Sequence, residues 1–236
     1  MMDKDIYPDC SLKINFIYPA DYPDKGVLKS IQKQFISEYF DDEYADLTPK
    51  EAVEKYTKDY MDTFKENEKA FLADIEDHQS EPEALLYSEY LMINHQVMYN
   101  RNDLLSFEIY REVYNGGAHG GHNYSYKVLN LKTGRQITES DIFIDDYQDD
   151  LTKIIIDGIA LFNNVDEVEE LENIGYFDIN EIRPNKNFYV DETGITYTFN
   201  EYEIAAYVVG ATFVQLPYEK IRHLLRKDSP IATIAF

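Results

Sequence analysis

Apolar and polar residues alternate along several short stretches of the chain, and a period of two is typical of strands with one buried face. The alternation occurs in residues 12–18, 85–99, 105–113 and 124–128. The sequence Asn100-Arg-Asn-Asp103 lies between the second and third stretches and is a turn signal. We therefore expect an antiparallel meander from residue 85 onward, preceded by a separate strand at residues 12–18.

Other stretches place apolar residues three and four positions apart, which predicts amphipathic helices. Residues 27–40, 53–75 and 151–162 have this spacing. The second of these helices has a clear start signal in Thr48-Pro-Lys-Glu51, which offers a capping threonine, a proline at the first helical position and a glutamate at the third. A last helix is expected to open at Pro217 and to run through Leu225.

A second group of strands follows the helix at residues 151–162. Residues 188–190 and 195–199 predict a hairpin, and residues 211–216 predict a further strand. Because helices occur between groups of strands, the fold class is predicted to be α+β. We expect an antiparallel sheet, built of a meander and hairpins, to pack with several amphipathic helices.

The net charge of the chain limits the classes of partner that it is expected to bind. With 22 basic and 45 acidic residues among 236, the formal net charge is −23. Nucleic acids require a positive groove, so no nucleic-acid partner is expected. Such acidity favours cationic partners, and the alternative is that it serves only to keep the protein soluble. The acidic run at residues 166–172 is expected to be a solvent-exposed face. The apolar run at residues 204–214 is shorter than the ~20 residues that cross a bilayer, so no membrane-spanning segment is expected.

Glycine and histidine are concentrated in one short stretch. Gly116, Gly117, Gly120 and Gly121 surround His119, and His122 follows at once. The favoured interpretation is a hairpin whose backbone needs glycine, with both imidazoles bonded locally. The alternative is a metal site formed by His119 and His122, but zinc usually takes three or four protein ligands and no cysteine lies nearby. We expect no cofactor, no resident metal and no catalytic residue.

A set of motifs follows in a fixed order, and the order and spacing make the set specific. The motifs are Tyr114-Asn-Gly-Gly-Ala-His119, Thr133-Gly134, Asp141-Ile-Phe143, Phe188-Tyr-Val190, Gly194-Ile-Thr-Tyr-Thr-Phe199, Tyr202-Glu-Ile-Ala205, Tyr207, Gly210 and Val214-Gln-Leu-Pro-Tyr218. With them the chain resembles the family shared by the extracellular part of the anti-sigma-V factor and the N-terminal region of peptidoglycan deacetylase C. The resemblance divides the chain into a tail (1–11), a deacetylase-C-N-terminal-like segment (12–113) and an anti-sigma-V-factor-like segment (114–228), and the two segments are expected to form one compact unit.

The resemblance implies an α+β domain outside the cytoplasmic membrane, in a periplasmic, cell-surface or secreted protein. The anti-sigma-V factor binds lysozyme, so the resemblance implies a non-catalytic binding module for a cationic protein such as lysozyme, or for peptidoglycan. His119, Tyr202 and Tyr207 are the expected contact residues, and the alternative for the two tyrosines is a supporting role in the core or hairpin. The sequence has neither a transmembrane segment nor a sigma-binding region, so a signalling role is not expected. It also departs from the family at Ala206, where members often have proline, and it does not contain the deacetylase catalytic domain. Two alternative functions remain: a metal-assisted hydrolase that uses His119 and His122, and a purely structural envelope protein.

Overall fold

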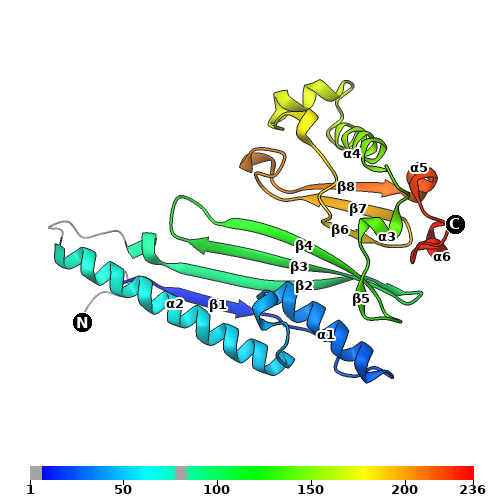
Figure 1. The fold of residues 1–236 in the computed structure, drawn as a ribbon. Helices are drawn as coiled ribbons and strands as arrows, with labels where there is room; N and C mark the ends of the chain where they lie inside the picture. Colours follow the sequence, from blue (N-terminus) through cyan, green and yellow to red (C-terminus); the bar gives the residue numbers. More distant parts are fainter. Residues whose placement is uncertain (1–6, 78–83) are drawn as a thin grey trace. The chain divides into compact units, whose positions relative to one another are not determined.

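The chain folds into two compact units, each built from several stretches of sequence. A computed structural model describes residues 7–77 and 84–236 (Figure 1). Unit 1 comprises Met1–Tyr18, Gln32–Asn94 and Tyr110–His122, and unit 2 comprises Pro19–Ile31, His95–Ile109 and Asn123–Phe236. Each unit therefore draws on both of the segments predicted from the sequence, 12–113 and 114–228. Of the predicted tail, residues 1–6 lie outside the described residues.

The larger sheet has five strands in the order β1-β2-β3-β4-β5. These strands are β1 (Cys10–Ile14), β2 (Glu89–Arg101), β3 (Leu104–Asn115), β4 (Gly121–Asn130) and β5 (Arg135–Gln136). Strands β2 to β4 form the predicted meander, and Asn102 and Asp103 make its first turn with φ of 54° and 58°. Strand β1 departs from the antiparallel prediction because it pairs with β2 in parallel. The chain between them passes through two helices, which is the kind of crossover that a parallel pair requires.

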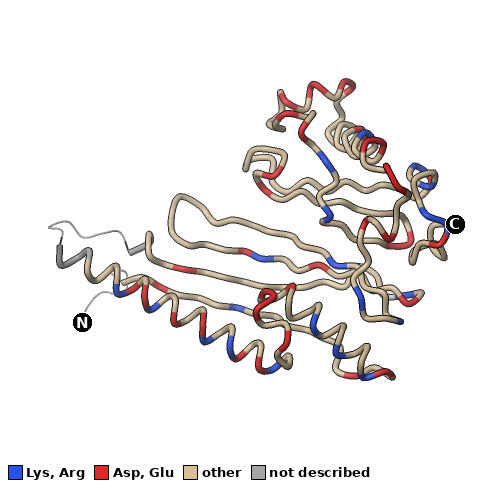
Figure 2. The backbone as a smooth tube through the Cα atoms, viewed as in Figure 1, with Lys and Arg blue, Asp and Glu red and all other residues tan. Residues whose placement is uncertain are grey.

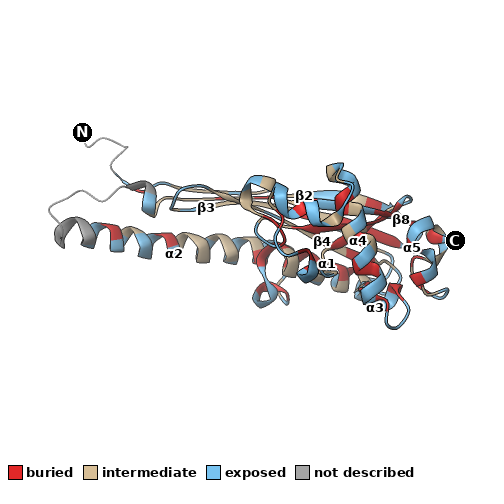
Figure 3. Ribbon diagram, turned by 90° about the horizontal axis from the view of Figure 1, so that it is seen from above, coloured by how far each residue is buried: buried red, intermediate tan, exposed pale blue. Residues whose placement is uncertain are grey.

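Aromatic side chains fill much of the core of unit 1. They come from the end of α1 (Lys25–Phe40), from α2 (Pro49–Asp77) and from the segment after β1. The Phe16 ring lies 4.6 Å from that of Tyr39 and 4.9 Å from that of Phe40, and the Phe40 ring lies 5.0 Å from that of Tyr56. Figure 1 shows α2 running along β1, and Figure 3 shows buried positions on α2 separated by exposed ones. The aromatic part of this core therefore consists of phenylalanine and tyrosine, because the chain contains no tryptophan.

The helix start predicted at Thr48 is confirmed. The backbone nitrogen of Thr48 donates to Glu51 Oε2 at 3.0 Å, and the backbone nitrogen of Glu51 donates to Thr48 Oγ1 at 3.4 Å. This reciprocal pair is a capping box, which satisfies two of the helix's otherwise unpaired donors. Helix α2 therefore begins where its sequence signal lies, at Pro49.

Three predicted elements have different limits in the structure. The strand expected over 12–18 ends at Ile14, because Phe16 turns its ring into the aromatic core. The strand expected from 85 begins at Glu89, after the 3-10 turn η3 (Ala84–Tyr87). The last helix is shorter than predicted: α5 (Tyr218–Ile221) passes into η7 (Arg222–Leu224), because Leu225 is already extended and bridges to Phe143.

The smaller sheet lies in unit 2 and is antiparallel in the order β6-β7-β8. Its strands are β6 (Phe188–Val190), β7 (Gly194–Phe199) and β8 (Thr212–Pro217), as the hairpin and strand patterns predict. Helix α4 (Gln148–Asn163) packs on β8, and Gly158 permits the close approach, since an added Cβ would lie 2.6 Å from Val214 Cγ1. With strands and helices in both units, the α+β prediction is confirmed.

A buried carboxylate ties α3 (Glu139–Ile142) to the small sheet. Glu139 is 5% exposed, and its two oxygens accept hydrogen bonds from the Tyr147 hydroxyl at 2.7 Å and the Tyr197 hydroxyl at 3.0 Å. The backbone nitrogen of Lys186 donates a third, at 3.1 Å. Three donors satisfy a group that is costly to bury alone, so Glu139 is a structural junction within unit 2.

Two asparagine side chains occupy the edge of β4 that faces away from β3. Asn200 Oδ1 accepts from the backbone nitrogen of Tyr124 at 2.7 Å, and Asn200 Nδ2 donates to the Tyr124 carbonyl at 3.0 Å. Asn187 Oδ1 accepts from the backbone nitrogen of Tyr126 at 3.0 Å, and its Nδ2 donates to the Tyr124 carbonyl at 2.9 Å. These amides take the place of a neighbouring strand along this part of the edge.

Candidate functional site

The glycine-rich stretch forms the connection between β3 and β4 in unit 1. Gly116 and Gly117 have φ of 79° and 101°, values that side-chain-bearing residues rarely adopt. A Cβ on Gly116 would also lie 2.2 Å from the Leu86 carbonyl oxygen. Gly120 and Gly121 do not have positive φ, and a Cβ on them would lie 3.0 Å and 3.7 Å from atoms of Val113. Backbone geometry thus accounts for the first pair of glycines more fully than for the second.

The two histidines of this connection have different surroundings. His119 is exposed, and its Nδ1 lies 2.8 Å from the Gly120 carbonyl oxygen. The ring of His122 stacks on that of Tyr110 at 6.2 Å, with 14° between the planes. Among residues 7–77 and 84–236, no group of three or more His, Cys, Asp or Glu side chains is placed to hold a metal ion. The metal-site alternative therefore gains no third ligand in the described part of the chain.

The other two predicted contact residues, Tyr202 and Tyr207, lie together in unit 2. Their rings stack at 5.7 Å with 26° between the planes. The chain at 204–206 runs beside residues 175–177, since Phe177 N donates to the Ile204 carbonyl at 2.9 Å and Ala206 N donates to the Gly175 carbonyl at 2.8 Å. We call residues 174–177 and 202–208 the tyrosine ledge.

The tyrosine ledge presents apolar side chains to solvent. Tyr202 is 57% exposed and Val208 is 88% exposed, and Ile174 and Phe177 are also exposed. Exposed large apolar groups that gather in one place are a frequent mark of an interaction surface. The ledge is also fixed in shape, because Glu203 accepts hydrogen bonds from Asn200 N at 2.9 Å and Asn185 Nδ2 at 2.7 Å.

Much of the protein's acidity is concentrated in the same unit. Residues 141–181 contain thirteen Asp and Glu residues and a single basic residue, Lys153. They form the start of α4, the 3-10 helix η4 (Val168–Ile174) and the 3-10 turn η5 (Ile179–Glu181), where Figure 2 shows successive acidic positions. We call residues 141–181 the acidic segment. Because η4 leads into the tyrosine ledge, the ledge lies at the border of a strongly negative surface.

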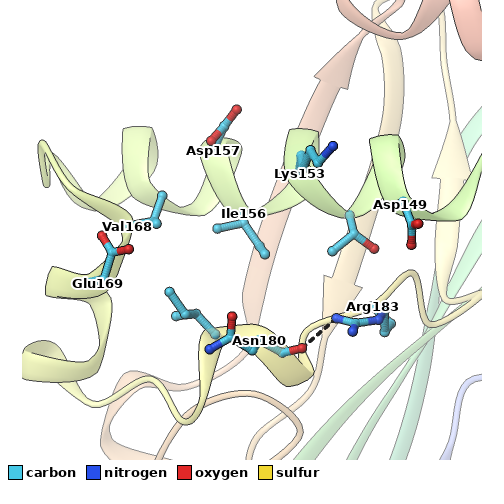
Figure 4. Close-up of a pocket in the computed structure, with 10 residues that line it drawn as sticks. Asp149, Lys153, Ile156, Asp157, Val168, Glu169, Asn180 and Arg183 are labelled. Carbon is cyan, nitrogen blue, oxygen red and sulfur yellow. Dashed lines mark hydrogen bonds between the residues drawn. The ribbon is translucent and has the colours of Figure 1, made fainter.

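A hollow of about 420 Å³ opens between α4 and the segments η4 and η5 (Figure 4). Ile156, Val168 and Ile179 contribute apolar side chains to its lining. In Figure 4, Asp149 and Arg183 lie toward one end and Glu169 toward the other, whereas Asp157 lies above Ile156 and points away from η5. Aliphatic side chains therefore line the middle of the hollow, and charged residues lie around it.

Polar groups around the hollow differ in how far they are already satisfied. Arg183 Nη1 donates to the Asn180 carbonyl at 2.7 Å and to the Ile182 carbonyl at 2.6 Å, which fixes the guanidinium in place. Lys153 Nζ lies 3.5 Å from Asp150. Thr152 is only 8% exposed, and its hydroxyl has no hydrogen-bond partner among the described residues. A buried hydroxyl without a partner is uncommon and calls for an explanation.

Sequence reasoning did not find this hollow. Asp149, Thr152, Lys153 and Ile156 have the spacing of one helix face, and that signal was present in the sequence. The opposite wall comes from η4 and η5, which have no strong periodicity. Their position against α4 depends on tertiary packing around the buried Leu171 and Ile179, which a single sequence does not reveal.

Comparison with known proteins gives two family matches. A family described as "Protein of unknown function (DUF3298)" matches residues 140–219, and one described as "Deacetylase PdaC" matches residues 9–122. No curated protein matches the sequence. In the part of the chain that the structure describes, no helix is both long enough and apolar enough to span a membrane.

Similar solved structures include the following two. One is a DUF3298 family member from Bacteroides fragilis NCTC 9343, with 31% identity and a TM-score of 0.88 over 97% of this chain and 89% of that one. The other is a DUF3298 family protein from Pseudomonas aeruginosa PAO1, with 16% identity and a TM-score of 0.49 over 60% of this chain and 63% of that one.

Proposed function

Because this chain belongs to the DUF3298 family of proteins of unknown function, we propose that it is a non-catalytic binding module of the cell envelope that captures a cationic protein. The observation that carries the proposal is the tyrosine ledge at the border of the acidic segment. The envelope location rests on the resemblance to the anti-sigma-V factor and to peptidoglycan deacetylase C. The enzymatic alternative has less support, since the described residues bring no third metal ligand to His119 and His122.

The acidic segment and the tyrosine ledge have separate roles in this proposal. Long-range attraction to thirteen carboxylates speeds the encounter with a positively charged protein. Attraction of this kind gives little specificity, and salt screens it within about 8 Å at physiological ionic strength. The lifetime of the complex then depends on contacts from which water is excluded. Tyrosine is among the residues that dominate binding energy in interfaces. Tyr202 and Tyr207 are therefore the contacts expected to slow dissociation.

Calorimetric titration with lysozyme, as a model cationic protein, tests the proposal. We expect saturable 1:1 binding that persists at physiological salt. An unrelated protein of equal negative charge is the control for general attraction. Binding of lysozyme no tighter than this control would contradict the proposal, whatever its salt dependence. Sedimentation with insoluble peptidoglycan, without any lysozyme binding, would also contradict it, because the ligand would then be the glycan.

Variants separate the two contributions. We expect Tyr202→Ala and Tyr207→Ala each to raise the dissociation constant about tenfold or more, mainly through faster dissociation. The matched control is Tyr18→Ala, which removes a 37% exposed tyrosine of unit 1. Neutralising the acidic segment with Glu167→Gln, Glu170→Gln and Glu172→Gln is expected to slow association and to flatten its salt dependence. An equal loss from Tyr18→Ala would remove the ledge from the proposal.

A further inference from the structure

We propose that the partner's contact segment is amphipathic, with apolar side chains flanked by lysine or arginine, and that Phe162 at the end of α4 is a second apolar anchor beside the tyrosine ledge. This inference rests on the proposed capture of a cationic protein, and it names what the captured surface must present. The end of α4, the tyrosine ledge and the acidic chain that joins them all lie in unit 2.

Phe162 lies on the side of α4 that faces the small sheet. Leu151 and Ile155 precede it on this side at helical spacing, and both are buried. Gly158, one turn before Phe162, is the residue that closely approaches Val214 of β8. Phe162 itself is 71% exposed. The apolar stripe of α4 therefore ends in an aromatic ring that the folded chain leaves largely uncovered.

The end of α4 is hydrogen-bonded to the tyrosine ledge. Asn163 Nδ2 donates to the Tyr176 hydroxyl at 3.1 Å, and that hydroxyl oxygen lies 3.2 Å from Thr212 Oγ1. Tyr176 belongs to the ledge, and Thr212 is the first residue of β8, into which the chain runs from the ledge. Phe162 adjoins Asn163, so it lies at the end of the small sheet where the ledge also lies.

The chain that joins α4 to the ledge, residues 164–173, is strongly acidic. It has five exposed carboxylate residues and no basic one, and these are Asp166, Glu167, Glu169, Glu170 and Glu172. None of these carboxylates is in an ion pair within the part of the chain that the structure describes. Their charge is therefore available to the basic side chains of a partner that rests on the two apolar anchors.

The charge around the anchors decides which apolar partner fits. A second copy of this chain would bring the same carboxylates, and the formal net charge of −23 opposes that pairing. An anionic lipid surface is repelled for the same reason. A purely cationic segment would compensate the carboxylates but leave Phe162 and the ledge in contact with water. A segment with both basic and apolar side chains satisfies both parts of the surface.

Two peptides of identical composition test the chemistry of the partner. Each has about 14 lysine, leucine and alanine residues; in one the leucines lie on a single face of a helix, and in the other they are spread around it. We expect calorimetry at physiological salt to show at least about tenfold tighter binding of the amphipathic peptide to the full chain. Equal affinities would overturn the inference, and so would no binding of either peptide up to about 1 mM.

Two neighbouring residues of α4 provide a matched pair of variants. Phe162→Ala should weaken binding of the amphipathic peptide and of lysozyme about tenfold. Leu161→Ala removes a side chain of similar exposure, 69%, on the side of α4 that bears Lys153 and Asp157, and it should have no effect. Both side chains are largely exposed, so circular dichroism should stay unchanged in both variants. Equal losses in the two variants, or no loss in Phe162→Ala, would overturn the second anchor.

Lysozyme titration separates this inference from the proposed function. Lysozyme binding that depends on Tyr202 but not on Phe162 would overturn the second anchor and leave the capture of a cationic protein intact. Absence of saturable lysozyme binding would instead overturn the proposed function. The comparison of the two peptides would then still decide whether this surface takes an amphipathic partner.

Discussion

Tyr202 combines an unfavourable backbone with an exposed aromatic side chain. Its φ of 64° lies in the left-handed region, which costs a residue with a Cβ roughly 1–2 kcal/mol. Stability alone favours asparagine or glycine at such a position. The side chain is 57% exposed, and its ring stacks on that of Tyr207. In the proposed capture of a cationic protein, the exposed part of this ring is the surface that the partner contacts.

Replacement of Tyr202 should separate stability from binding. We expect Tyr202→Asn to leave the free energy of unfolding unchanged or to raise it by up to about 1 kcal/mol, because asparagine tolerates the left-handed region. The same change should weaken lysozyme binding. Chemical denaturation and calorimetry measure the two effects, with Tyr207→Asn as a control that gains no backbone relief. A loss of more than about 2 kcal/mol would show that the Tyr202 side chain supports the fold.

At the residue scale, the sequence predicted Tyr202 and Tyr207 as contact residues but gave no geometry for them. The motif order pointed to Tyr202 and Tyr207 together, and the structure stacks their rings. The positive φ of Tyr202 belongs to the turn at 200–203, which Glu203 closes through Asn185 and Asn200. Contacts between distant residues such as Asn185 and Glu203 have no local sequence signal.

The β3–β4 connection allows a direct test of its glycines at the scale of one element. Gly116→Ala should destabilise the protein by about 3 kcal/mol or more, because the new Cβ would meet the Leu86 carbonyl at 2.2 Å in addition to the strained φ of 79°. Gly117→Ala has a φ of 101° but open space around its Cβ, and it should cost only about 1–2 kcal/mol. Thermal or urea unfolding measures both. Equal costs would mean that backbone strain, and not the contact with Leu86, sets the requirement.

Elements with local start and stop signals were predictable from the sequence. Helix α2 begins at its capping box, and the β2–β3 hairpin turns at Asn102 and Asp103. The limits of β1, β2 and α5 were wrong because tertiary contacts decide them: Phe16 enters the aromatic core, and Leu225 bridges to Phe143. The parallel pairing of β1 was also missed, because two strands far apart in sequence carry no mark of their relative direction.

At the scale of the whole molecule, buried tyrosines predict a loss of stability at alkaline pH. Burial raises the pKa of Tyr39, Tyr126 and Tyr197 above the ordinary value of 10.0, and the nearby carboxylates of Glu108 and Glu139 add to the shift for the latter two. Because the unfolded chain loses these protons first, their contribution is complete below pH 10 and declines as the pH rises toward the folded-state pKa. Each such tyrosine lowers stability by up to about 1.4 kcal/mol per pH unit in that window.

Tyrosinate absorbance measures this effect cleanly, because the chain has 21 tyrosines and no tryptophan. We expect two phases in the folded protein. The later phase comes from the buried tyrosines, and it coincides with the loss of circular dichroism. In denaturant, a single phase near pH 10 is the reference. A single phase near pH 10 in the folded protein, with circular dichroism intact, would contradict the expected burial.

The asparagines beside β4 have a consequence for the behaviour of many copies together. A tyrosine-rich strand with an open edge is a template on which another chain can add, and growth of that kind leads to cross-β fibres. Asn187 and Asn200 already bond the backbone nitrogen and carbonyl of Tyr124 and the backbone nitrogen of Tyr126. A side-chain amide provides no strand backbone with which a further strand could pair, so strand addition cannot continue at these positions. These hydrogen bonds therefore protect Tyr124 and the backbone nitrogen of Tyr126 from pairing with a strand of another copy.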